Sequence, residues 1–251
     1  MGRRCDRNGA MSFLGISDII SFVSHGSIKS EVLWEAAKDL RYLLNRGYPR
    51  RTSLELVGNR YQLLFDHRHL LHRGVFSDAD SKSRLKKIVF LKDLQSHNLA
   101  IDAYNVIITI EAALSGRPLV LGDDGFIRDI SGLSGNFKRT EKTEEAIELL
   151  LKILKKADPS QALFLFDSPI SRSGELTREV RVRMREKDLR GDAKALPVPE
   201  KVLIGFPGIV ATSDTAIIDQ SDRVVDLAGA IVKKQLSRRA KHADARLFCF
   251  V

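Results

Sequence analysis

Acidic residues follow four apolar runs of this sequence, each where a buried strand is expected to end. The runs are LAIDAYN with Asp102, LVLGDDG with Asp123 and Asp124, LFLFDSP with Asp167, and IVATSDTAIID with Asp214 and Asp219. Ligands of open parallel sheets bind beyond the carboxyl ends of the strands, so we expect these acids to converge there. Carboxylates held close together raise one another's pKa, and a divalent cation relieves the repulsion. Oxygen ligands without Cys or His suit Mg²⁺ or Mn²⁺, which act on phosphate esters by activating water and neutralising phosphoryl charge.

Each acid also has a purely structural interpretation. Asp102, Asp167 or Asp214 can cap the helix that follows its strand, and the DDG segment at 123–125 is an ordinary turn sequence. For a single acid the structural interpretation is favoured. Four acid-bearing strand ends in one sheet favour a metal-binding cluster.

The elements that must position these acids alternate between strand and helix after residue 92. Expected strands are 99–101, 118–121, 162–166, 208–211, 223–225 and 246–250. Expected helices are 106–114, 144–156, 174–187 and 227–236. Because parallel neighbours need crossover connections, this order predicts an α/β fold with a mostly parallel sheet flanked by helices.

A small, basic α-helical domain is expected before the sheet, at residues 30–92. Apolar residues recur at helical spacing from Ser30, and Thr52 with Glu55 has the form of a capping box that opens a second helix. The join between the two helices carries four arginines, which are Arg46, Arg50, Arg51 and Arg60. Cations at a helix N-terminus suit phosphate binding, and a solvated turn is the alternative. His67, His69 and His72 have no cysteine or acidic ligand nearby, so a surface helix end is favoured over a zinc site.

The composition indicates a globular protein with a polyanionic partner. The chain has 251 residues and a formal net charge of +9, which suggests nucleic acid, although many basic proteins have no such partner. Its two cysteines, Cys5 and Cys249, cannot build a disulfide framework, which fits a reducing cytosol and a cytoplasmic location. Residues 11–26 are interrupted by Asp18 and lack a cleavage site, so we interpret 1–29 as a tail or packed helix, and no window is apolar enough to span a membrane.

The segment IDAYNVI resembles the opening strand motif of the NYN branch of PIN-like nucleases, and FLFDSP and VATSD resemble later elements of that superfamily. The resemblance covers roughly residues 99–234. It implies a PIN-like, Rossmannoid module in which Asp102 is the first metal ligand, Asp167 the second-strand acid and Asp214 the acid of the TSD turn. By the same resemblance Asn105 orients the site or contacts phosphate. The whole chain also resembles uncharacterised archaeal proteins that join a basic helical domain to such a module.

Two segments depart from the PIN pattern, LGDDGFIRDISGLSGN and SPISRSGEL. They leave open which of Asp123, Asp124, Asp129 and Asp167 completes the site. Arg128 in the first segment, and Arg172 beside several serines in the second, suit a phosphate contact, with plain capped loops as an equal alternative. Tyr104 is expected to line the site, and Glu111 faces either the site or solvent.

Taken together, these features predict a metal-dependent nuclease acting on RNA in preference to DNA, in which a metal-activated water attacks the phosphodiester. The predicted parts are 1–29, the helical domain 30–92 and the PIN-like domain 93–251. The catalytic set is Asp102, Asn105, Asp167 and Asp214, and the ligands of Mg²⁺ or Mn²⁺ are Asp102, Asp124, Asp167, Asp214 and Asp219. The nucleic-acid-binding set is Arg46, Arg50, Arg51, Arg60, Arg128 and Arg172. Two alternative functions stay open: a non-catalytic RNA-binding adaptor of the same fold, and a phosphoryl-transfer enzyme with Asp167 as nucleophile. For the assembly, a homodimer is the candidate.

Overall fold

Five parallel strands form the main sheet of the protein, as a computed structural model of residues 30–130, 137–239 and 247–250 describes it. The segment 1–29, interpreted above as a tail or helix, lies outside the described residues. The sheet has the order β5-β4-β1-β6-β7, and its strands are β1 Asn98–Asp102, β4 Gln161–Asp167, β5 Gly191–Leu196, β6 Ile209–Ala211 and β7 Val224–Val225. The chain extends the sheet from β1 to β5 on one side and then adds β6 and β7 on the other. The strand order therefore reverses between β1 and β6, the kind of position where open α/β sheets bind ligands.

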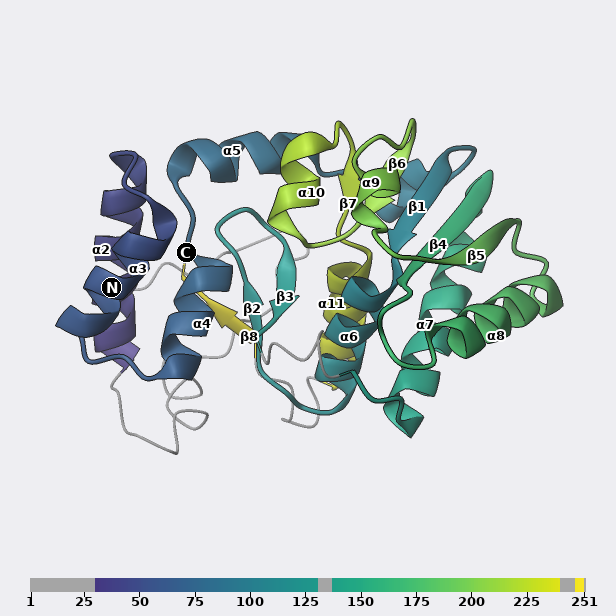
Figure 1. Cartoon of the computed structure of the whole chain (residues 1–251), viewed down its shortest axis with the longest axis horizontal. Helices are drawn as coiled ribbons and strands as arrows, with labels where there is room; N and C mark the ends of the chain where they lie inside the picture. The colour runs from purple at the N-terminus through teal and green to yellow at the C-terminus, as the bar shows by residue number, and fades with distance from the viewer. Residues whose placement is uncertain (1–29, 131–136, 240–246, 251) are drawn as a thin grey trace.

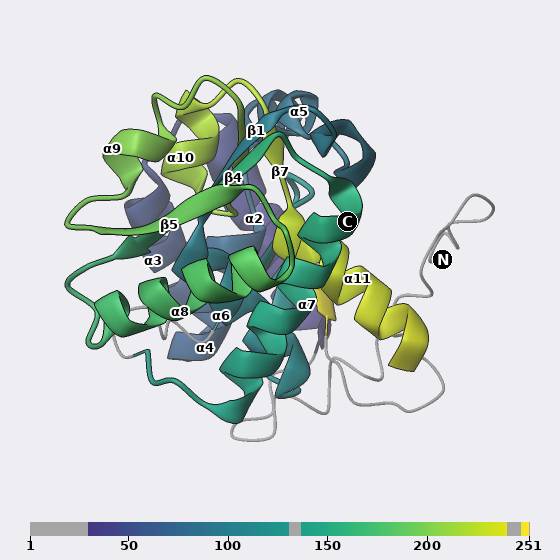
Figure 2. The same cartoon turned by 90° about the vertical axis from the view of Figure 1, so that its right-hand side faces the viewer.

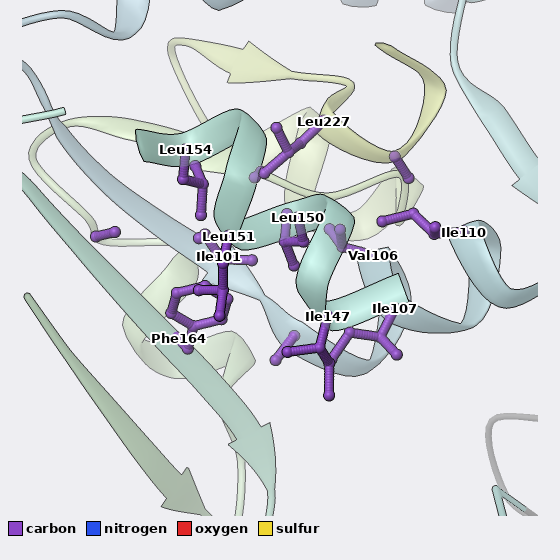
Figure 3. Close-up of a cluster of buried hydrophobic side chains, with 14 of the residues drawn as sticks. Ile101, Val106, Ile107, Ile110, Ile147, Leu150, Leu151, Leu154, Phe164 and Leu227 are labelled. Atoms are coloured by element: carbon purple, nitrogen blue, oxygen red, sulfur yellow. The ribbon is translucent and has the colours of Figure 1, made fainter. Parts of the chain in front are cut away.

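Helices cover both faces of this sheet (Figures 1 and 2). One face packs against α6 Ala103–Leu114, α7 Glu141–Ala157, α8 Ser173–Glu186 and α11 Leu227–Arg239. The other face packs against α9 Glu200–Leu203 and α10 Thr215–Gln220. Figure 3 shows the larger core, where Leu151 of α7 lies near Ile101 and Phe164 of the strands and Ile147 of α7 lies near Ile107 of α6. This arrangement confirms the α/β fold class with a parallel sheet flanked by helices.

A second, smaller sheet holds two of the strands that the sequence assigns to the main one. It has the order β3-β2-β8, with β2 Leu119–Leu121, β3 Ile127–Asp129 and β8 Leu247–Cys249. Strands β2 and β3 are antiparallel, whereas β2 and β8 are parallel. The acids that follow β2 therefore belong to a different sheet from the acids that follow β1, β4 and β6.

The N-terminal helices pack on this small sheet. They are α2 Ser30–Asn45, α3 Arg50–Arg60, α4 Phe65–Gly74 and α5 Asp78–Lys87, followed by the 3₁₀ turn η1 Leu91–Leu94. Leu33, Leu40 and Leu71 share a buried cluster with Val120 and Phe248 of the sheet. Figure 1 shows α2 and α3 at one end of the long axis, the main sheet toward the other and the small sheet between them.

Two elements were missed because their sequences are polar. The stretch SDADSKSRLKK forms α5, which Ser77 caps by accepting a hydrogen bond from Asp80 N at 3.1 Å. Strand β5, with the sequence GDAKAL, pairs with β4 alone and is half exposed, so it needs no apolar run. None of the described helices is long and apolar enough to cross a membrane.

Candidate active site

Asp102 ends β1 beside the switch point of the main sheet. Its Oδ2 accepts a hydrogen bond from Thr212 Oγ1 at 2.8 Å, which ties the ends of β1 and β6 together. Asp102 is the N-cap residue of α6, and its side chain makes no capping hydrogen bond of normal geometry, although the backbone N–H of Asn105 in the first turn lowers its pKa. Burial raises the pKa of Asp102 to about 7; the hydrogen bond from Thr212 opposes this rise, and the charges of Asp167 and Asp214 add to it. Part of this carboxylate is therefore protonated near neutral pH unless a cation faces it.

Asn105, in the first turn of α6, fixes the turn at 212–214. Its Oδ1 accepts hydrogen bonds from Ser213 N at 2.9 Å and from Ser213 Oγ at 3.0 Å. The carbonyl of Ser213 accepts in turn from Arg128 Nε at 2.8 Å. The turn that carries Thr212 and Asp214 is thus held from both sides, which keeps the hydroxyl of Thr212 on Asp102.

Asp167 ends β4, the neighbour of β1, and is partly exposed. Burial raises its pKa, and the negative charge of Glu200 at the start of α9 raises it further. Glu200 is an acid of this sheet edge that sequence reasoning missed, because it follows a proline and not the end of an apolar strand.

Tyr104 lies buried against the rings of Phe137 and Phe166, at centroid distances of 5.0 and 5.3 Å. Its hydroxyl is buried, and the described part of the chain offers it no hydrogen-bond partner. Burial raises the pKa of Tyr104 to about 12, and the nearby charge of Asp167 contributes. The hydroxyl therefore stays protonated and is available as a donor beside Asp167.

Asp214 serves as a helix cap. Its Oδ1 accepts from Ala216 N at 2.8 Å and from Ile217 N at 3.3 Å, at the start of α10. The structural interpretation therefore accounts for one oxygen of this carboxylate. Its negative charge still contributes to the raised pKa of Asp102, so it remains part of the acidic edge.

Asp124 and Asp219 lie in ion pairs, which corrects their prediction as metal ligands. Asp124 is fully buried, and both its oxygens accept from Arg128 at 2.7 Å, while Arg84 Nη1 lies 3.2 Å from Oδ2. Asp219 accepts two hydrogen bonds from Arg84, at 2.7 and 2.8 Å. Guanidinium groups already compensate both charges, so neither acid needs a metal.

The other acids of the first departing segment have similar structural roles. Asp123 accepts two hydrogen bonds from Arg41, at 2.8 and 3.0 Å, and joins α2 to the small sheet. Asp129 is buried on β3.

Glu111 faces neither the site nor solvent: it is buried and accepts from Thr143 Oγ1 at 2.7 Å. The structure therefore leaves Asp102, Asp167 and Asp214, joined by Glu200, at the main sheet edge. Asp226, which follows β7, is a further acid of this edge, and it accepts hydrogen bonds from Ile127 N at 2.9 Å and Gly229 N at 2.8 Å.

The acidic edge offers two carboxylates with raised pKa values, Asp102 and Asp167, and not a cage of three or more ligands among the described residues. In the described ranges, no group of three or more His, Cys, Asp and Glu side chains is placed to hold a metal ion, which also leaves the three histidines of α4 without a zinc geometry. Mg²⁺ commonly binds through one or two carboxylates, with water and substrate phosphate completing its shell. Asp102 and Asp167, on adjacent strands, each raised in pKa and with no ion-pair partner among the described residues, match that pattern.

The arginines predicted to bind nucleic acid divide into buried and exposed groups. Arg128 is buried and pairs with Asp124, and Arg50 donates to the carbonyls of His72 and Val75 at 2.9 and 2.6 Å. Both side chains stabilise the fold, which corrects their prediction as free cations on the surface. Arg46, in the turn after α2, and Arg51 and Arg60 of α3 are exposed, at the end of the molecule away from the main sheet (Figure 1). Arg172 is exposed at the start of α8, after Asp167, and pairs with Glu175 at 2.8 Å.

Comparison with known proteins places the chain beside two described families. The model of a "Domain of unknown function (DUF5616)" matches residues 91–230, and that of a "Protein of unknown function (DUF434)" matches residues 32–87. An uncharacterized protein of Methanocaldococcus jannaschii is 34% identical over 201 residues, which cover 79% of this chain and 96% of that protein. No solved structure matches the chain significantly.

Proposed function

The chain belongs to the DUF5616 family, and for this member we propose a divalent-metal-dependent hydrolase of phosphodiester bonds in nucleic acid, RNA in preference to DNA. The observation that carries the proposal is the environment of Asp102. This carboxylate is partly buried at the switch point of a parallel sheet, lies within electrostatic range of further carboxylates and has no cation paired with it in the part of the chain that is described. An uncompensated buried charge costs several kcal/mol, so a site that retains one is suited to a cation from outside.

The residues of the sheet edge have distinct roles in this proposal. Asp102 and Asp167 would hold Mg²⁺ or Mn²⁺, and Thr212 fixes the orientation of the Asp102 carboxylate. When bound, the metal supplies Lewis acidity for activating water and for neutralising phosphoryl charge. Asn105 keeps the turn at 212–214 in place, and the hydroxyl of Tyr104 is placed to donate a hydrogen bond beside Asp167. The resemblance of IDAYNVI to the NYN motif supports the same assignment of Asp102 and Asn105.

The formal charge of +9 supports a polyanionic substrate, since the acidic edge alone repels phosphate. The exposed Arg46, Arg51 and Arg60 near α2 and α3 offer cations for a long nucleic acid, although Arg60 lies 3.6 Å from Asp39. We propose a cytoplasmic protein, and a homodimer as the assembly to test by light scattering.

The test is cleavage of labelled single-stranded RNA, structured RNA and single-stranded DNA in Mg²⁺, Mn²⁺ or EDTA. We expect metal-dependent cleavage of RNA that Asp102→Asn loses while it keeps RNA binding. Asp192→Asn, on the outer strand β5, is the matched control and should cleave normally. Cleavage by Asp102→Asn at the wild-type rate would refute the assignment.

A second function is favoured by the lack of a three-ligand group among the described side chains. In this alternative the protein binds RNA without hydrolysis, as an adaptor. It predicts tight, salt-sensitive binding and no turnover in any metal, so the same assay separates the two functions.

A further inference from the structure

Arg73, in the last turn of α4, reaches the sheet edge from the helical region. Its carbonyl accepts from Arg128 Nη1 at 3.4 Å, and Nε of the same guanidinium donates to Ser213 O at 2.8 Å. The backbone carbonyls of Arg73 and Ser213 therefore contact the same guanidinium, that of Arg128. This places Arg73 next to the turn that carries Thr212 and Asp214.

The side chain of Arg73, unlike those of the other arginines around it, has no carboxylate partner among the described residues. Arg41, Arg84 and Arg128 each bind a carboxylate at 2.7 to 2.8 Å. Arg73 is half-buried, its Nε is buried without a hydrogen-bond partner, and no carboxylate oxygen of the described residues lies within 4.0 Å of its guanidinium nitrogens. A buried donor without an acceptor destabilises a fold, and more so when it carries charge.

The charged groups that act on Arg73 indicate that its side chain lies near the acidic edge. Burial lowers its pKa and Arg128 lowers it again, while the negative charges of Asp129 and Asp214 act in the opposite direction. Asp214 also contributes to the raised pKa of Asp102, so one carboxylate lies within electrostatic range of both side chains. A guanidinium without an acceptor thus borders an acidic edge without a cation.

We propose that Arg73 binds a non-bridging phosphate oxygen of the nucleic-acid backbone beside the acidic edge. The inference rests on the proposed function and adds to it a phosphate-binding residue supplied by the helical region. A guanidinium suits this role because its fork of N–H groups matches a phosphate and keeps its charge at all physiological pH values. It also offsets the repulsion between the carboxylates and the substrate.

The proposal gives the helical region a role in the site. The segment matched by the DUF434 model contains Arg73, whereas Asp102, Asp167 and Asp214 lie in the segment matched by the DUF5616 model. The two segments are held together by the pairing of Arg84 with Asp124 and Asp219, and by the packing of α4 on the small sheet. Neither segment alone provides both the acids and the cation.

The test compares Arg73→Gln and Arg73→Lys with Arg185→Gln, which removes one charge from an exposed arginine on α8. Binding of a fluorescent single-stranded RNA is followed by anisotropy in EDTA over a range of salt concentrations. Arg73→Gln should weaken binding at least about tenfold and lower the slope of log K against log salt by about 0.7. Arg73→Lys should keep the slope and lose part of the affinity. Arg185→Gln should match the wild type.

Two further readouts distinguish a phosphate-binding role of Arg73 from a structural one, and failure of this inference from failure of the proposed function. Because the Arg73 side chain has no hydrogen-bond or ion-pair partner among the described residues, Arg73→Gln should melt no lower than the wild type, whereas a structural arginine would lower the melting temperature. If the wild type binds RNA and Arg73→Gln binds it with unchanged affinity and slope, the inference fails alone, whether or not the wild type cleaves. If the wild type neither binds nor cleaves nucleic acid, the proposed function fails and the inference fails with it.

Discussion

Asp102→Asn should stabilise the metal-free protein, and should do so more strongly as the pH rises. The pKa of Asp102 is about 7 in the folded state against 3.8 for the ordinary group, so the folded state binds the proton more tightly than the unfolded state. The favourable contribution of the protonated form is fully present below pH 3.8 and is lost as the pH rises through about 7. The loss is at most about 4 kcal/mol, and about 2 kcal/mol once discounted for the remaining exposure of the residue.

Asparagine has the same shape and keeps an oxygen that can accept from Thr212 Oγ1, but it carries no charge. The free energy of unfolding of Asp102→Asn should therefore exceed that of the wild type by about 2 kcal/mol at pH 8, and the difference should shrink toward pH 5. In thermal melts in EDTA this corresponds to about 4 to 8 °C for a chain of this size.

Bound metal should make the wild type more stable than Asp102→Asn. Saturating Mn²⁺ stabilises the wild type by about 2.7 kcal/mol at 100 times its dissociation constant, and should leave Asp102→Asn unchanged. A pH-independent difference between the two proteins, or a lower melting temperature of the variant at pH 8, would refute the assignment of an uncompensated buried carboxylate. Equal stabilisation of both proteins by Mn²⁺ would place the metal elsewhere.

Three further substitutions test the roles assigned to neighbouring residues. Asp124→Asn should lower the free energy of unfolding by about 3 to 5 kcal/mol in urea titrations, because it leaves the buried guanidinium of Arg128 without a carboxylate and Arg84 with Asp219 alone. Asp219→Asn, at a half-exposed site, should cost about 1 kcal/mol or less, and equal costs would contradict the assigned burial. Asn105→Ala should cost about 1 to 3 kcal/mol and abolish cleavage, since Ser213 loses its acceptor, and wild-type cleavage rates would show that the turn needs no such support. Tyr104→Phe should melt within a few degrees of the wild type, because the hydroxyl has no partner to lose in the described part of the chain, but should slow cleavage; an unchanged rate would remove Tyr104 from the site.

The sequence predicts the main sheet well because its inner strands are apolar runs that end in acids. It cannot assign a strand to a sheet, however, and the run before Asp123 and Asp124 is apolar and followed by acids, as is the run before Asp102. The difference arises from the pairing of β2 with β3 and β8, a long-range contact in the case of β8. The prediction that all four acid-bearing ends converge is wrong for this reason.

The ion pairs of α5 show a second limit. Arg84 meets Asp124 and Asp219, which lie 40 and 135 residues away in the chain. Nothing in the polar stretch SDADSKSRLKK indicates a buried arginine, because burial of its charge depends on partners that only the tertiary fold brings together. Arg73 was missed for the same reason, since its sequence context is that of an ordinary basic helix end.

Two buried charges that differ in their surroundings bear on what the sheet edge binds. Asp124 is completely buried, yet Arg84 and Arg128 neutralise it within the protein. Asp102 faces a hydroxyl and further carboxylates, and Arg73 faces no acceptor among the described residues. A protein that needed only stability would pair such groups with each other, as it does at Asp124. Leaving a carboxylate and a guanidinium unpaired around one turn creates a demand for a cation on one side and an anion on the other, and a metal ion bound to a phosphate group meets both at once.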